Sequence, residues 1–72
     1  MVDINKLKGK IVEKGYSVAT LAERLPFSSS TFYRKLEENG TTISIGEADA
    51  IATLLDLNYS EIMDIFFAQI VA

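Results

Sequence analysis

The side chains with the most evident chemistry lie in one short stretch, residues 28–35, which reads SSSTFYRK. Its hydroxyls can both donate and accept hydrogen bonds, and its two cations can pair with phosphate oxygens. Side chains of these types contact the phosphates and the base edges of nucleic acids. The candidate residues for such a surface are Ser29, Ser30, Tyr33, Arg34 and Lys35, together with Arg24 just before the stretch.

The sequence lacks the residue types most often used for catalysis and metal binding. The chain contains no histidine and no cysteine, so it lacks the commonest general base, the commonest metal ligand and any thiol nucleophile. The serine run has no neighbouring base to activate it, and the carboxylates are scattered rather than paired. We therefore predict that the protein is not an enzyme and that it holds no metal ion or cofactor.

The length and composition favour one small globular domain. The 72 residues, 49% of them apolar, predict a single domain over residues 1–72 with its own core. No apolar run approaches the roughly 20 residues that span a bilayer, and the N-terminus lacks the apolar region of a signal peptide. We expect a cytoplasmic protein of a bacterial host, without a membrane partner.

Charge is distributed unevenly along the chain. The net charge is −3, but residues 1–36 carry all seven cations and a net +4, whereas residues 37–72 carry no cation and a net −7. This asymmetry predicts a bipolar molecule, with one pole for phosphates and the other for a basic protein surface. Lys6, Lys10 and Lys14 recur every four residues, and they form either a solvated face or a ridge that faces phosphates.

The apolar spacing predicts an all-α fold of about five short helices. The first three helices are expected over about 5–14, 18–25 and 29–38, with Gly15 and Asn39-Gly40 as left-handed stops. Pro26 separates the second helix from the third, in the layout of a helix-turn-helix. The stretch 41–43 is expected to be extended. Ser17, Ser28, Ser44 and Ser60 are predicted to cap the helices that follow them, Ser44 with Glu47 in a capping box.

The last helix is apolar on nearly every side. Ile62, Ile65, Phe66 and Ile70 form one face, and a second face carries Met63, Phe67 and Val71, with Asp64 nearby. A helix of this kind is buried or meets a partner. Either the chain's tail folds across the core, or the second face is a surface for self-association or for another protein.

Taken together, the segments SVATLAERL and SSSTFYRKLEENG resemble the repressor/Cro-type helix-turn-helix domains of temperate phages. Three shorter motifs, INKLKGKIVEKG, STFYRKL and EIMDIFF, resemble small modulator-of-repression (antirepressor) proteins of phages that infect lactic-acid bacteria. The resemblance implies a lambda-repressor-like fold whose third helix enters the major groove. Two features depart from the broad family. Val18 occupies a place where such repressors often carry a DNA-contacting glutamine, and the reading positions hold serines, which discriminate poorly among bases.

Two functions are therefore open. The first is an antirepressor in the lysogenic/lytic switch, which binds the basic DNA-binding domain of a companion phage repressor through an acidic, partly apolar surface. The second is a Cro-like homodimer that binds operator DNA directly. The composition and the narrower resemblance favour a regulator that acts at least partly through the repressor and binds DNA weakly by itself.

Overall fold

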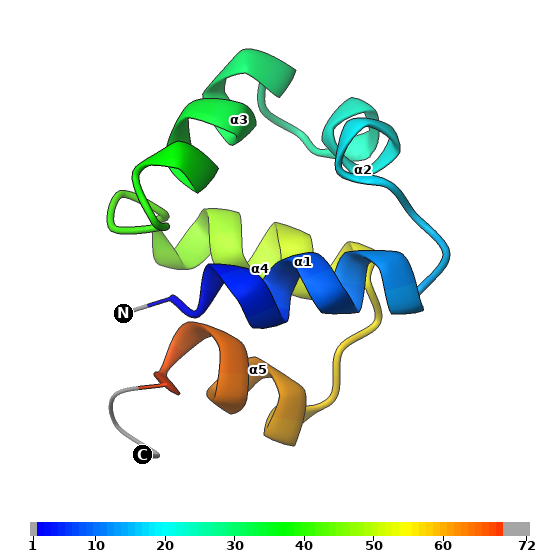
Figure 1. The fold of residues 1–72 in the computed structure, drawn as a ribbon, viewed down its shortest axis with the longest axis vertical. Helices are drawn as coiled ribbons and strands as arrows, with labels where there is room; N and C mark the ends of the chain where they lie inside the picture. Colours follow the sequence, from blue (N-terminus) through cyan, green and yellow to red (C-terminus); the bar gives the residue numbers. More distant parts are fainter. Residues whose placement is uncertain (1, 69–72) are drawn as a thin grey trace.

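A computed structural model describes residues 2–68, which form five short helices. The helices are α1 (Ile4–Glu13), α2 (Val18–Arg24), α3 (Ser29–Glu37), α4 (Ile45–Leu54) and α5 (Tyr59–Phe66). In Figure 1, α1 and α4 cross the middle of the molecule, while α2 and α3 lie at one end of its long axis and α5 at the other. The prediction of an all-α, five-helix fold is confirmed. Within the described residues, no helix has the length and apolar character needed to span a membrane.

The core draws on every helix. Its fully buried side chains are Leu7, Ile11, Leu21, Phe32, Ile51, Leu55 and Ile65. Phe32 is the largest of them, and its ring meets that of Phe27 edge to face, with the ring centres 6.3 Å apart. Such aromatic pairs stabilise a core beyond the area that they bury. Because α3 places Phe32 and Leu36 on one face, four residues apart, its opposite face is turned to solvent.

Three of the four predicted serine caps are present. The side chains of Ser17, Ser28 and Ser44 accept hydrogen bonds from the backbone N–H three residues on, at 3.1–3.2 Å. The predicted capping box at Ser44 is complete, because the Glu47 carboxylate accepts from the Ser44 N–H at 2.9 Å. These caps satisfy N–H groups that have no partner within their own helix.

The fourth predicted cap, Ser60, is wrong. The N-cap of α5 is Asn58, whose side-chain oxygen accepts from the Glu61 N–H at 2.8 Å, while Glu61 accepts from the Asn58 N–H at 2.9 Å. This reciprocal pair needs an acid three residues after the cap, and Met63 stands there if Ser60 is the cap. The first helix likewise starts one residue earlier than expected, at Ile4, because Asp3 caps it.

Helices α1, α3 and α4 end in left-handed residues. Gly15 (φ +90°), Asn39 (φ +58°) and Asp56 (φ +54°) each follow a helix, and the next residue donates its N–H back to the helix. Gly40 (φ +72°) is also buried, and a Cβ there would lie 2.7 Å from the Cβ of Val2, so only glycine fits. Residues 41–42 continue as a turn rather than as the predicted extended segment, because Gly40 and Glu38 accept N–H bonds from the residues beyond them.

Ion pairs join α1 to α5. The Nζ of Lys6 lies 2.7 Å from a carboxylate oxygen of Asp64, and the Nζ of Lys10 lies 2.6 Å from Glu61. Lys14 is more distant from Glu61, at 3.9 Å. The backbone adds a further link, from the Asp3 N–H to the Ile65 carbonyl at 2.7 Å. The lysine row of α1 therefore lies beside α5, whose carboxylates pair with its charges, while the Lys6–Asp64 pair stays about half exposed to solvent. Paired lysines of this kind are less available to phosphates than the predicted ridge requires.

These contacts shift the protonation equilibria of the paired groups. The Lys10 ammonium, followed by the Asn58 N–H, holds the pKa of Glu61 below its ordinary value of 4.5. Glu61 and Glu13 in turn raise the pKa of Lys10, and the hydrogen bond to Asp64 raises that of Lys6. All of these shifts favour the charged forms in the folded state, so folding and ionisation are linked.

Replacing Phe32 by alanine should destabilise the fold severely. The side chain is fully buried, and loss of a buried phenylalanine ring costs about 3–5 kcal/mol. The free energy of unfolding, measured by urea denaturation, should fall by that amount or the variant should be unfolded. Tyr33→Ala is the matched control, because Tyr33 is 41% exposed on the same helix and its loss should cost far less. A Phe32→Ala variant with the parent's midpoint would contradict the packing described above.

The α1–α5 ion pairs should make stability fall in acid. Since the pKa of Glu61 is lower in the folded state than its ordinary value of 4.5, its contribution is present above that value and is lost as the pH falls through the lower, folded pKa. Glutamine at position 61 can still accept the hydrogen bond from the N–H of the cap residue Asn58. Glu61→Gln should therefore show a smaller difference in Tm between about pH 6 and about pH 3.5 than the parent protein does. Glu23→Gln is the control, because Glu23 pairs with no cation in the described chain. Equal pH dependence in the two variants would contradict the role given to Glu61.

Candidate nucleic-acid interface

The connection between α2 and α3 sets the position of α3. Leu25, the residue before Pro26, has extended backbone angles (φ −76°, ψ 151°) and ends α2, as expected for a residue that precedes proline. Phe27 then packs against the core from its partly buried position, and Ser28 caps α3. The two helices pack directly on each other. The predicted helix-turn-helix is therefore present, held by one buried turn residue and one cap.

The side of α3 that faces away from the core is polar. Ser30, Tyr33 and Arg34 are exposed, and Ser29 is partly buried. Glu37 is exposed as well, one turn beyond Tyr33. We call Ser30, Tyr33, Arg34 and Glu37 the α3 outer face, because their spacing of three and four residues places them on one side of the helix. The sequence singled out three of these four. Ser29 lies three residues before the buried Phe32 and seven before the buried Leu36, so it belongs to the side of α3 that faces the core. Helix α3 itself lies at the end of the molecule away from α5 (Figure 1).

Lys35 does not belong to this face. Its ammonium lies 3.2 Å from the Glu47 carboxylate and donates to the Thr42 carbonyl at 2.8 Å, and its side chain is only 12% exposed. The Ser44 N–H and then the Lys35 ammonium lower the pKa of Glu47. Lys35 thus ties α3 to the start of α4, and the expectation that its charge lies near a phosphate backbone has to be revised.

The two ends of α2 differ in their exposure to solvent. Arg24 is exposed, and its guanidinium donates to the Tyr16 hydroxyl at 3.4 Å, a long hydrogen bond that leaves most of its donors available. Val18, the first residue of α2, packs against the core from a partly buried position. The position at which the resemblance implied a DNA-contacting glutamine therefore contributes packing here.

The predicted protein-partner surface on α5 is only partly exposed. Phe67 is 39% exposed at the end of the helix, and Met63 is half-buried. Asp64 is exposed, but its charge is matched by Lys6. Val71 lies outside the described residues. Among the described candidates, Phe67 is the one that offers a large apolar surface to a partner.

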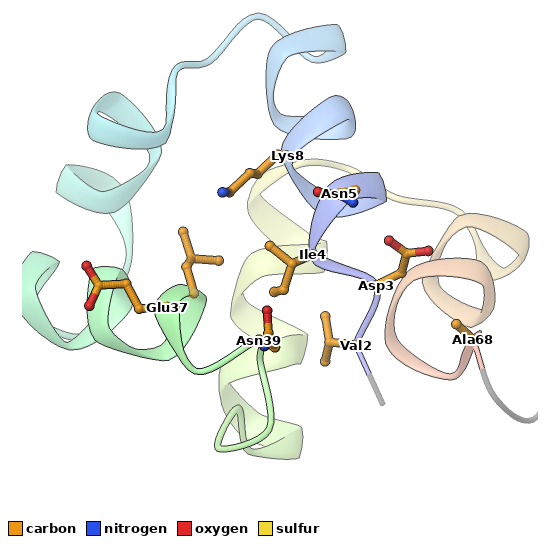
Figure 2. A pocket seen from close by; sticks show the side chains of 9 residues that line it. Val2, Asp3, Ile4, Asn5, Lys8, Glu37, Asn39 and Ala68 are labelled. Atoms are coloured by element: carbon orange, nitrogen blue, oxygen red, sulfur yellow. The ribbon is translucent and has the colours of Figure 1, made fainter.

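Two charged residues were not singled out from the sequence: Glu37, which belongs to the α3 outer face, and Lys8, which lines a pocket with it. Both line an open pocket of about 560 Å³ between the start of α1 and the end of α3. Figure 2 shows Val2 and Ile4 in the same pocket, and the Glu37 carboxylate pointing away from its centre. Helical spacing could have identified Glu37, four residues after Tyr33. Local spacing could not have identified Lys8, because the residues that surround it depend on how α1 and α3 lie relative to each other.

Comparison with known proteins agrees with this geometry. Neither the curated proteins nor the solved structures include a significant match to the chain. A family model described as "Cro/C1-type HTH DNA-binding domain" matches residues 6–67, from the first turn of α1 to the end of α5. The family consists of DNA-binding domains rather than enzymes, and the match does not separate antirepressors from repressors. By this match and by its fold, the chain belongs to the Cro/C1-type helix-turn-helix DNA-binding family.

Proposed function

We propose that the protein is a transcriptional regulator of a phage lysogenic/lytic switch that acts at least partly as an antirepressor, by binding the DNA-binding domain of a companion repressor. One observation supports this most strongly. Among the described residues, Lys8, Arg24 and Arg34 are the only cations outside an ion pair, whereas six carboxylates have no cationic partner. These are Asp3, Glu23, Glu37, Glu38, Asp49 and Asp56.

This balance opposes tight binding to naked DNA. The affinity of a protein for nonspecific DNA comes almost entirely from cations that neutralise phosphates. Four of the seven cations are already paired with carboxylates of the chain itself. A repressor's DNA-binding surface is basic, so an acidic helix-turn-helix protein is complementary to it and not to its operator.

Direct operator binding as a Cro-like homodimer is the second candidate. The exposed Arg24 and Arg34 support it, since they lie on α2 and α3 with guanidinium groups outside any ion pair of the described chain. Phe67 is then the centre of a dimer contact. The two functions are compatible, because a protein bound to a repressor can also touch DNA.

Fluorescence anisotropy with a labelled random duplex separates the two functions. At about 50 mM salt the isolated protein should bind weakly, and the small number of free cations should give a shallow loss of affinity between about 50 and about 200 mM. The protein should also release a purified repressor domain from a labelled operator and elute with that domain in size-exclusion chromatography. Tight, steeply salt-dependent binding of the protein alone, without any effect on the repressor, would favour the Cro-like function instead.

Phe67→Asp should remove association, whether with a second copy or with a repressor domain. A carboxylate in an apolar contact has to be desolvated without a partner, which costs several kcal/mol. Tyr59→Asp is the matched control, because Tyr59 is 77% exposed at the other end of α5. Circular dichroism should show that both variants are helical. Sedimentation should show that Phe67→Asp has lost association and that Tyr59→Asp associates as the parent does. An unfolded Phe67→Asp variant would place this residue in the core.

A further inference from the structure

The carboxylate of Glu37 has no partner among the residues that the structure describes. Glu37 is exposed at the last position of α3, and its carboxylate makes no hydrogen bond or ion pair with any described residue. Lys8 and Glu37 line the same pocket between α1 and α3, but they form no ion pair with each other. Figure 2 shows the Glu37 carboxylate directed away from this pocket. Its neighbour Glu38 differs, because Glu38 accepts a hydrogen bond from the Thr42 hydroxyl at 2.8 Å.

The position is also unfavourable for a negative charge. The last turn of a helix carries the negative end of the helix dipole and exposes carbonyl oxygens, so cations are preferred there. A residue that breaks this local rule without a compensating contact is a candidate for a functional role.

The geometry places Glu37 among the residues that would meet a nucleic acid. It lies three residues after Arg34 and four after Tyr33, and side chains at these spacings are neighbours on a helix surface. Its charge therefore offsets that of Arg34, the one cation of the α3 outer face. A carboxylate at this place repels the phosphates that Arg34 attracts.

We propose that Glu37 is a specificity-determining residue, which weakens the binding of the α3 outer face to DNA and so disfavours nucleic acid relative to a protein partner at that face. The inference rests on the proposed use of α3 as the nucleic-acid-facing helix. It differs from that proposal in assigning the low DNA affinity to one carboxylate rather than to the net charge of the chain.

The test compares charge changes of equal size at two places. Glu37→Gln and Asp49→Asn each remove one carboxylate that has no ion pair in the described chain, and Asp49 lies on α4 rather than on α3. The probe is a labelled random duplex followed by anisotropy at about 50 mM salt, where phosphate contacts are weakly screened. We expect Glu37→Gln to bind about five- to tenfold tighter than the parent, Glu37→Lys tighter still, and Asp49→Asn nearly as the parent. The Tm of Glu37→Gln should equal or exceed that of the parent, because an unfavourable dipole interaction is removed.

Equal affinities of Glu37→Gln and Asp49→Asn would overturn the inference, and so would weaker binding by Glu37→Gln, which would make Glu37 a base-contacting residue. Absence of binding even by Glu37→Lys would also overturn it. Arg34→Gln identifies which premise has failed. If that variant binds DNA as the parent does, α3 is not the DNA-facing helix. If it binds more weakly while Glu37→Gln gains nothing, only the role of Glu37 is lost. Release of the repressor domain from operator, measured with the parent protein, tests the antirepressor function independently of both.

Discussion

The structure depends on the burial of one side of α1. Leu7 and Ile11 are completely buried, and α1 contacts both α2 and α5. The helix is therefore the element that holds the helix-turn-helix at one end of the molecule and α5 at the other (Figure 1). In a domain of this size each core side chain contributes a large share of the buried apolar area. The two residues Leu7 and Ile11 therefore matter strongly for the stability of the fold.

The lysine-bearing face of α1 determines which charges of the molecule are paired internally. Its lysines pair with Glu61 and Asp64 of α5, and Lys35 of α3 pairs with Glu47 of α4. A chain whose halves carry charges of opposite sign thus folds so that much of the asymmetry is cancelled internally. Exposed ion pairs contribute little to stability individually. Their larger consequence here is for binding, because a paired lysine is less available to a phosphate.

Much of the fold could be predicted because its signals are local. A cap needs a side-chain oxygen, such as that of serine, that accepts from the N–H three residues on. A helix stop needs a residue that tolerates the left-handed region, most often glycine or asparagine. Both can therefore be recognised within a few residues. Ser44 with Glu47, and Asn39 with Gly40, were identified in this way. The error at Ser60 has the same origin, because Asn58 and Ser60, two residues apart, are both of types that cap helices, and only Asn58 has an acid three residues on.

By itself the sequence determined the all-α fold, the helix-turn-helix and the serine, tyrosine and arginine side chains of the α3 outer face, since helical periodicity decides which residues share a face. The tertiary structure decided which charges remain available. Lys35 and the lysines of α1 lie in the cationic half of the sequence, but their carboxylate partners are between 12 and 58 residues away, with the single exception of Glu13. Such pairings depend on how the helices pack, because Coulomb interactions act across space and are not encoded in local spacing.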